Sequence, residues 1–173
     1  MYTFYSGGAE GADMIWAKAL RQAGHAVKEY RPADYVNLDR RWKDIISEQY
    51  IEVCRIIHRT ILSEKTFSGQ LVRRNIMQAD KASEIFAVAN LKDGRIDEGT
   101  AYVVTRGLIL GKKVTLYNQL DNTWYFNGEG LHGQFIQCRY EPVLCDKAAV
   151  VGTRNITMEG ARAIVDIVDR SFK

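Results

Sequence analysis

Hydrophobic residues occur along the chain in two recurring patterns, short apolar runs and longer segments with helical spacing. Short β-favouring runs cover residues 2–5, 25–30, 85–89, 113–117 and 148–151. Segments with apolar residues three or four positions apart cover 9–23, 42–62, 67–81, 98–110 and 157–172. Gly24 and Gly111 follow two of these segments, as glycines that end helices do. The pattern predicts strands that alternate with helices.

Two further β-favouring runs, at residues 123–126 and 135–140, flank Gly128, Gly130 and Gly133. They predict a small β-hairpin within an insertion at residues 118–147. The segment 32–41 is polar and predicts a loop. Alternating strands and helices favour parallel β-α-β units, whose right-handed crossovers place helices on both faces of a sheet. We therefore expect one α/β domain over residues 1–173, with a doubly wound, mainly parallel, Rossmann-like sheet.

Composition restricts the function classes only modestly. The 173 residues carry a formal net charge of +3 with interspersed charges, which does not favour nucleic-acid binding but allows a small anionic ligand. Three cysteines without a CxxC pair favour a reducing compartment over a disulfide framework. His25, His58 and His132 lack metal-ligand spacing, so we expect no metal and no cofactor. Without a signal-peptide pattern or an apolar run of about 18 residues, the chain is expected to be cytoplasmic, with no membrane partner.

Three predicted strand-to-helix junctions carry unusual residues. They are Ser6-Gly7-Gly8-Ala9-Glu10-Gly11-Ala12-Asp13, Asp97-Glu98-Gly99-Thr100 and Gly152-Thr153-Arg154-Asn155. In a parallel sheet such junctions lie together at the carboxyl edge, where doubly wound folds bind their ligands. We therefore expect the three junctions to line one crevice.

The first junction is suited to an anion. Its glycines let the backbone approach a bound group closely, and the start of the following helix favours negative charge. A lone glycine loop more often serves only a tight turn, but three junctions in register favour a phosphate site. Arg154, and Arg74 with Asn75 on the helix at 67–81, offer further contacts. The junction matches neither GxGxxG nor GxxxxGKS/T, so it indicates neither a dinucleotide fingerprint nor ATP hydrolysis.

Carboxylates at Glu10, Asp13, Asp97 and Glu98 would repel an anion and need another role. One role is interaction with the helix dipole or capping, worth about 0.3–1 kcal/mol each. The other is hydrogen bonding to ribose, or stabilisation of positive charge on a sugar during cleavage of a glycosidic bond. Both roles stay open for Asp13 and Glu98, while the helix dipole is the favoured interpretation for Glu10 and Asp97.

These motifs, in this order, resemble the SLOG superfamily of Rossmann-like nucleotide-binding proteins, which includes the LOG phosphoribohydrolases and the DprA-like and YpsA-like proteins. The first junction is similar to the SGGAxGAD loop, and Gly99-Thr100 to the family's GT. Arg74-Asn75, with Met77 and Ala79-Asp80, is similar to the RNxxM and (A/S)D segment. The resemblance implies a nucleotide or nucleotide-derived ligand at the carboxyl edge, and self-association as a homodimer or higher homo-oligomer.

Val151-Gly152-Thr153-Arg154 resembles the G(S/T)R strand-to-helix unit of the family, but it comes last here and first in most relatives. The chain is thus similar to a circularly permuted, cpYpsA-related branch. Permutation costs little when the termini of a domain are close together. The resemblance predicts that the strand at 148–151 pairs with the strand at 2–5 or lies beside it in the sheet centre.

The resemblance departs from the catalytic pattern. LOG enzymes carry PGGxGTxxE, but Asp97-Glu98 replaces the two glycines and Val103 stands where the glutamate would be. The same Val103 aligns with the nucleophilic glutamate of nucleoside 2-deoxyribosyltransferases, which the segment 97–114 also resembles. Because valine neither attacks nor accepts a proton, binding or sensing of the ligand is the leading hypothesis. The alternative is a nucleotide N-glycosidase with Glu98 or Asp13 as catalytic residues, and a DprA-like DNA-binding role is a third hypothesis that the mild charge disfavours.

The predicted ligand-binding residues lie at the three junctions or on the adjoining helix. They are Ser6, Gly7, Gly8, Glu10, Asp13, Arg74, Asn75, Gly99, Thr100, Gly152, Thr153 and Arg154. We expect Ser6, Gly7, Gly8, Gly99, Thr100 and Arg154 to contact phosphate, and Asp13 and Asn75 to orient ribose or base.

Overall fold

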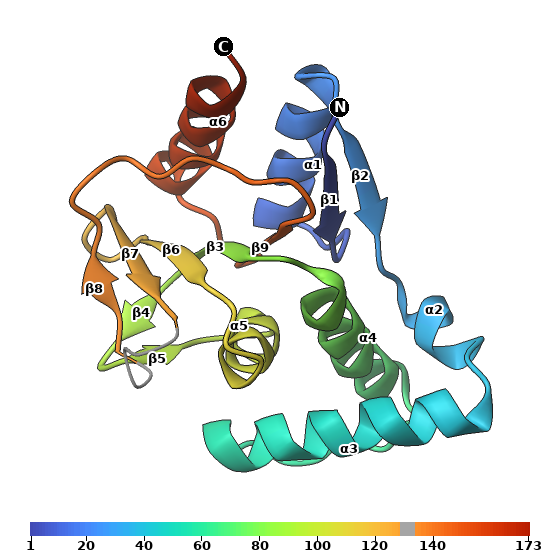
Figure 1. The fold of residues 1–173 in the computed structure, drawn as a ribbon. Coiled ribbons are helices and arrows are strands. Elements are labelled where there is room, and N and C mark those ends of the chain that lie inside the picture. The colour runs from blue at the N-terminus through green and yellow to red at the C-terminus, as the bar shows by residue number, and fades with distance from the viewer. Residues whose placement is uncertain (129–133) are drawn as a thin grey trace.

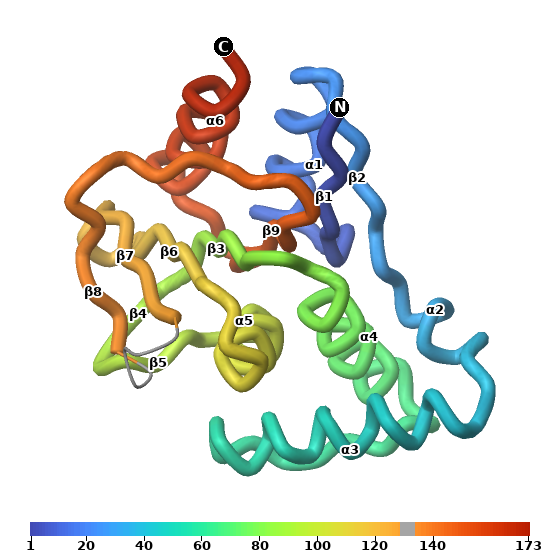
Figure 2. The backbone as a smooth tube through the Cα atoms, viewed as in Figure 1, coloured from blue at the N-terminus to red at the C-terminus, as the bar shows by residue number. Residues whose placement is uncertain are grey.

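A computed structural model of the chain describes residues 1–128 and 134–173 (Figures 1 and 2). Gly130 and Gly133, which the sequence assigns to the hairpin turn, lie outside the described residues. So does His132, for which the sequence predicts no metal-ligand role. The helices are α1 (Ala12–Gln22), α2 (Pro32–Val36), α3 (Arg40–Ile57), α4 (Phe67–Lys81), α5 (Thr100–Ile109) and α6 (Met158–Phe172). The strands are β1 (Thr3–Ser6), β2 (Ala26–Glu29), β3 (Ile85–Ala89), β4 (Leu91–Lys92), β5 (Arg95–Ile96), β6 (Val114–Asn118), β7 (Thr123–Asn127), β8 (Ile136–Gln137) and β9 (Ala149–Gly152).

A seven-stranded sheet with the order β2-β1-β9-β3-β6-β7-β8 forms the centre of the molecule. The first five strands in this order run parallel, and the hairpin strands β7 and β8 extend the sheet in antiparallel fashion from β6. β9, the last strand in the sequence, lies between β1 and β3, with Tyr5 and Ile85 both opposite Ala149. The prediction that the last strand lies beside the first, in the sheet centre, is confirmed.

Helices cover both faces of this sheet, as the strand pattern predicts (Figure 1). Alternate strand residues point to opposite faces: Phe86 and Val150 pack under α1 and α6, whereas Ala87 and Val151 pack under α4 and α5. A third apolar cluster lies outside the second face, where α3 crosses α4 and α5 around Tyr50. The chain is therefore an α/β protein with a mainly parallel, Rossmann-like sheet.

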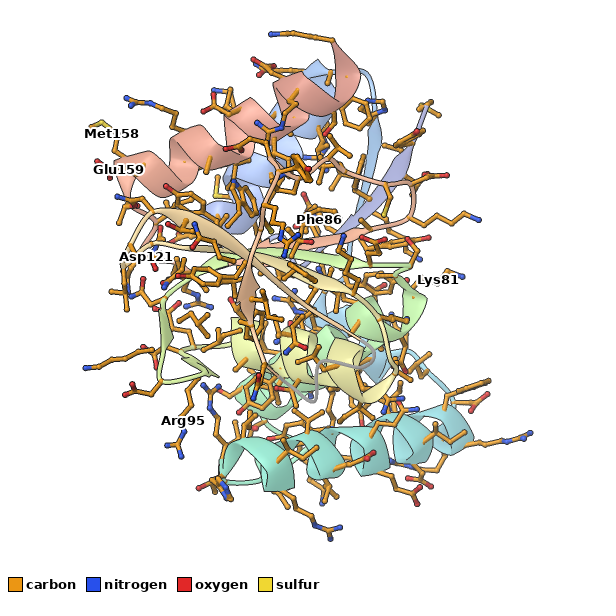
Figure 3. All side chains as sticks on the ribbon, turned by 60° about the vertical axis from the view of Figure 1, so that its left-hand side comes forward. Lys81, Phe86, Arg95, Asp121, Met158 and Glu159 are labelled. Carbon is orange, nitrogen blue, oxygen red and sulfur yellow. The ribbon has the colours of Figure 1, made fainter. Side chains whose placement is uncertain are left out.

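Among the described residues, large apolar side chains lie mainly in the interior and charged side chains mainly at the surface. Figure 3 shows Phe86 inside the molecule, where it is 1% exposed, while Lys81 and Arg95 extend outward.

The two ends of the chain are neighbours, because the rings of Tyr2 and Phe172 meet edge to face with centroids 5.3 Å apart. This is the arrangement in which permutation of a domain costs little. Within the described part of the chain, no helix combines the length and apolar character needed to cross a membrane.

The second hairpin strand, expected over residues 135–140, covers only Ile136–Gln137. Three further predicted boundaries are wrong, each for a local reason. The expected loop at 32–41 contains α2, because Pro32 begins a helical turn in which Asp34 accepts a hydrogen bond from Arg31 N at 2.7 Å. The helix expected to reach residue 62 ends at Ile57, because His58 adopts a left-handed conformation with φ 55°. The first helix begins at Ala12 and not at residue 9, because Gly11 has φ 85°.

Candidate functional site

The three junctions meet at the carboxyl edge of the central strands, because β1, β9 and β3 are adjacent in the sheet. Ala12 N donates a hydrogen bond of 3.0 Å to Thr153 O, which joins the first junction to the third. The Glu98 carboxylate accepts from Thr153 Oγ1 at 2.7 Å, which joins the second junction to the third. The expectation that the junctions converge is therefore confirmed in the described residues.

Two glycines make this close contact possible. A Cβ on Gly11 would lie 2.5 Å from the carbonyl oxygens of Thr153 and Arg154, and its φ of 85° also favours glycine. A Cβ on Gly152 would lie 2.5 Å from both Ala12 Cβ and Val88 O. Glycine at these positions lets the first turn of α1 press against the end of β9.

Asp13, in the first turn of α1, is buried, and its carboxylate faces backbone N–H groups. Oδ2 accepts from Ala9 N at 3.3 Å and Oδ1 accepts from Gly152 N at 3.1 Å. Burial raises the pKa of the Asp13 carboxyl to about 6, although the nearby Arg74 guanidinium and the N–H donors act in the opposite direction. Asp13 thus acts as an internal anion that fastens the glycine loop to β9.

Arg74 reaches the same place from α4 and differs sharply from its neighbour Arg73. Both side chains are buried, each residue being 4% exposed. Arg73 donates hydrogen bonds to Ser47 Oγ, Leu62 O and Gly69 O at 2.8–2.9 Å. Among the described residues Arg74 forms no ion pair within 4 Å, and its buried Nε has no hydrogen-bond partner. Burial lowers the pKa of Arg74, Asp13 raises it and Arg154 lowers it further.

The Arg74 guanidinium lies directly against the first loop. A Cβ on Gly7 would overlap Arg74 Nη1 and would lie 2.8 Å from Asp13 Oδ2. Gly7 is therefore needed for the close approach of an arginine to the loop backbone, and Gly7 itself is buried. The carboxylate, the guanidinium and the loop form one packed unit.

Glu98, unlike the buried Asp13 and Arg74, is exposed and lies at the rim of the site, just before α5. Its carboxylate accepts three hydrogen bonds from the third junction: Thr153 Oγ1 at 2.7 Å, Arg154 N at 3.2 Å and Asn155 Nδ2 at 3.1 Å. Its backbone has φ 63°, an uncommon conformation for a residue other than glycine. These contacts give Glu98 a role in holding two junctions together.

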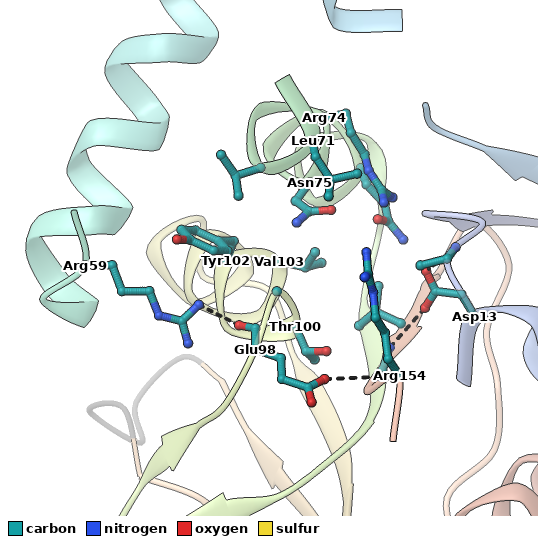
Figure 4. A pocket seen from close by; sticks show the side chains of 16 residues that line it. Asp13, Arg59, Leu71, Arg74, Asn75, Glu98, Thr100, Tyr102, Val103 and Arg154 are labelled. Atoms are coloured by element: carbon teal, nitrogen blue, oxygen red, sulfur yellow. Dashed lines mark hydrogen bonds between the residues drawn. The ribbon is translucent and has the colours of Figure 1, made fainter. Parts of the chain in front are cut away.

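A cleft of about 480 Å³ opens between these groups (Figure 4). Arg154 and Arg74 approach each other on one side of it, next to Asp13. The uncapped N-terminus of α5, at Gly99 and Thr100, also borders the cleft, and such termini attract anions. The lining residues are Ala9, Asp13, Arg59, Leu71, Val72, Arg74, Asn75, Gln78, Glu98, Gly99, Thr100, Tyr102, Val103, Val151, Gly152 and Arg154.

Most of the residues singled out from the sequence border this cleft, and five do not. Ser6, Gly7, Gly8, Glu10 and Thr153 are absent from its lining. Ser6 is fully buried, and its Oγ accepts from Gly8 N at 3.2 Å. Gly7 lies behind Arg74, Gly8 and Glu10 face outward, and Thr153 is occupied by Glu98. The loop therefore supports the cleft from behind, while side chains from α4 and Arg154 form its surface.

Five lining residues did not emerge from the sequence motifs. Three of them share the cleft-facing side of α4 with Arg74 and Asn75, a helical spacing that could have indicated them: Leu71, Val72 and Gln78. Tyr102 follows Thr100 on α5. Arg59 comes from the segment after α3, and no motif in the sequence connects it to the junctions.

The fold and the cleft define a Rossmann-like α/β protein with two converging arginines at the carboxyl edge of its sheet. Comparison with models of protein families, with curated proteins and with solved structures finds no match to this chain. Within residues 1–128 and 134–173, no group of three histidine, cysteine or acidic side chains is arranged to hold a metal ion.

Proposed function

We propose that the chain binds a small phosphorylated ligand, a nucleotide or nucleotide derivative, in the cleft bordered by Arg74 and Arg154. The observation that carries this proposal is the contrast between two adjacent arginines on α4. Arg73 is buried and fully engaged by the fold, whereas Arg74 is equally buried and leaves Nε without a partner. A buried guanidinium whose Nε has no hydrogen-bond partner within the fold is suited to a ligand.

The charges around Arg74 favour an anionic ligand. A buried charge without a hydrogen-bonding partner costs several kcal/mol. Asp13 compensates only in part, because its two oxygens already accept from Ala9 N and Gly152 N. Arg154 adds a second positive charge, which lowers the pKa of Arg74. A bound phosphate would satisfy both guanidinium groups with charge-assisted hydrogen bonds.

The remaining lining supports a ligand larger than phosphate alone. A volume of about 480 Å³ lies within the range of about 300–1,000 Å³ typical of small-molecule sites. Asn75 and Thr100 offer polar contacts, while Leu71 and Val103 offer apolar ones. The resemblance to the SLOG superfamily favours the same ligand class, and under this proposal the chain is a cytoplasmic, circularly permuted member.

Isothermal titration calorimetry with AMP, GMP, CMP, UMP and ribose 5-phosphate tests the proposal. We expect Arg74→Gln to weaken binding of every phosphorylated probe by at least about tenfold while leaving the melting temperature equal or higher, because it removes a buried unpaired charge. Arg73→Gln should instead lower the melting temperature, because it breaks three hydrogen bonds. Arg55→Gln, an exposed arginine on α3 outside the cleft, is the matched control for charge. Binding that Arg74→Gln leaves unchanged would contradict the proposal.

Hydrolysis of the ligand's N-glycosidic bond is the second candidate, and one observation favours it. Asp13 borders the cleft with a carboxyl whose pKa is raised to about 6, in the range suited to acid-base chemistry. Val103 carries no such group, and the Glu98 carboxylate already accepts three hydrogen bonds. Incubation with the same nucleotides should then release free base, detected by chromatography, and Asp13→Asn should abolish the release. Release that persists in both Asp13→Asn and Glu98→Gln would exclude these catalytic assignments.

A further inference from the structure

Arg59 enters the cleft from the side opposite to Arg74 (Figure 4). It owes this position to the end of α3, where His58 turns into the left-handed conformation and Arg59 N donates to Cys54 O at 3.0 Å. The turn sends the Arg59 side chain toward α5 and away from the axis of α3. Two residues after α3, a helix that contributes no residue to the described cleft lining, Arg59 thus becomes part of the cleft wall.

The Arg59 guanidinium is held in a fixed plane by two contacts. Its Cζ lies 5.0 Å from the centroid of the Tyr102 ring, over the face of the ring. Its Nη1 donates a hydrogen bond of 2.6 Å to Glu98 O. Tyr102 is buried, 6% exposed, and packs against Tyr50 with ring centroids 5.8 Å apart. Arg59 is only half-buried, so a flat cation rests on a rigid aromatic support and keeps exposed surface at the cleft.

The cleft therefore has two ends of different chemistry. Arg74, Arg154 and Asp13 lie at one end, Arg59 and Tyr102 lie at the other, and Asn75 and Val103 lie between them (Figure 4). A planar guanidinium stacks well on the flat face of an aromatic ring, and stacking of this kind holds bases in single-stranded nucleic-acid sites. The apolar Leu71 adds a surface suited to the same kind of group.

We propose that Arg59, supported by Tyr102, forms a stacking subsite for a planar ring of the ligand, such as a nucleobase, while Arg74 and Arg154 hold its phosphate. The inference rests on the proposed function for its phosphate end, and it assigns a new specificity-determining residue at the other end. The ligand class is then a phosphorylated molecule of mononucleotide size with an unsaturated ring, as opposed to a sugar phosphate or a molecule with anionic groups at both ends.

Calorimetry on the full chain with three kinds of probe separates the two ends. Ribose 5-phosphate carries the sugar and the phosphate without a base, and adenosine carries the sugar and a base without phosphate. The four nucleoside 5′-monophosphates carry the sugar, a base and the phosphate. For the wild type we expect the best nucleotide to bind about 5- to 150-fold more tightly than ribose 5-phosphate, the gain typical of stacking one base. Arg59→Lys keeps the charge and removes the flat fork, so it should erase most of that gain and change ribose 5-phosphate binding less than about twofold.

Arg55→Lys is the matched control, because it makes the same exchange at an exposed position of α3 outside the cleft, and nucleotide affinity should be unchanged. Arg74→Gln should weaken ribose 5-phosphate and nucleotides alike while leaving adenosine binding in place. Equal wild-type affinity for ribose 5-phosphate and for every nucleotide would overturn the subsite, and so would an Arg59→Lys variant that weakens both kinds of probe equally. Adenosine binding that depends on Arg59, together with no binding of ribose 5-phosphate, would instead support the subsite and contradict the proposed phosphate site.

Discussion

Asp13→Asn tests the electrostatics of the cleft without any ligand, through the pH dependence of stability. The carboxyl is buried and has a pKa of about 6 in the folded chain, against 3.8 for an ordinary aspartate. Since each pKa unit corresponds to about 1.4 kcal/mol, ionised Asp13 destabilises the fold by about 3 kcal/mol at neutral pH. Folding therefore opposes the ionisation of this residue.

The sign and the pH range follow from the two pKa values. Because the folded-state pKa is the higher one, the penalty is absent well below the unfolded-state value of 3.8, grows as the pH rises through about 6, and is complete above it. Asparagine has no such penalty at any pH. We expect the stability of Asp13→Asn relative to wild type to increase by about 2–3 kcal/mol between about pH 4 and about pH 7.5. The variant also loses an acceptor for Ala9 N or Gly152 N, at about 1–3 kcal/mol, but this loss is independent of pH and cancels in the difference.

Urea denaturation at four or five pH values measures this difference, with Glu64→Gln as a control of opposite sign. Hydrogen bonds from Arg40 and Tyr35 lower the pKa of Glu64 to about 2, so its ionisation stabilises the fold. Glu64→Gln should therefore lose stability relative to wild type as the pH rises from about 3 to about 6. A constant Asp13→Asn difference across the whole pH range would refute the assignment of a buried, proton-accepting carboxylate to the cleft.

Three further outcomes test the packing at the site, the capping of α6 and the predicted self-association. Gly152→Ala should destabilise the chain by about 2–4 kcal/mol in urea denaturation, because its Cβ would lie 2.5 Å from Ala12 Cβ and Val88 O; a loss below about 0.5 kcal/mol would contradict this. Thr157→Ala should cost about 1 kcal/mol, because its hydroxyl accepts from Gly160 N at the start of α6. If the predicted homo-oligomer forms through α3, where Trp42 is 53% exposed, Trp42→Glu should yield a monomer in light scattering, and an unchanged mass would exclude that surface.

The sheet was predictable because its strands are short, apolar and bounded by strong stop signals. β3 and α4 occur at the predicted residues, and the end of α1 follows from Gly24, whose φ is 86°. The hairpin β4–β5 was not predicted, because its strands have two residues each and no alternating pattern extends over them. The hairpin β7–β8 was predicted, but its role as a continuation of the main sheet depends on pairing with β6, which no local pattern encodes.

The candidate site was only partly predictable, since sequence spacing reports neighbours on one element and not contacts between elements. The meeting of the junctions could be predicted, because parallel strands bring their carboxyl ends together. Arg74 and Asn75 on α4 could be predicted from their donor groups and from the family resemblance. Arg59 was not, because its place in the cleft depends on the left-handed turn at His58 and on the way α3 crosses α5. Nor did the sequence distinguish Arg73 from Arg74, since both lie on the same helix and only the fold determines which one is hydrogen-bonded.

The positions of the two carboxylates make these acidic residues compatible with the proposed anion site at the same sheet edge. Asp13 uses N–H groups of the glycine loop and of β9, and Glu98 uses the donors of the third junction. Each carboxylate therefore fastens two segments together, and neither leaves the backbone cradle open to phosphate. Under the proposed function, an anion in the cleft contacts guanidinium groups and the start of α5, and side chains with planar, directional donors determine its recognition. Recognition by Arg74 and Arg154 should consequently be far more sensitive to Arg→Lys substitution than a backbone cradle would be.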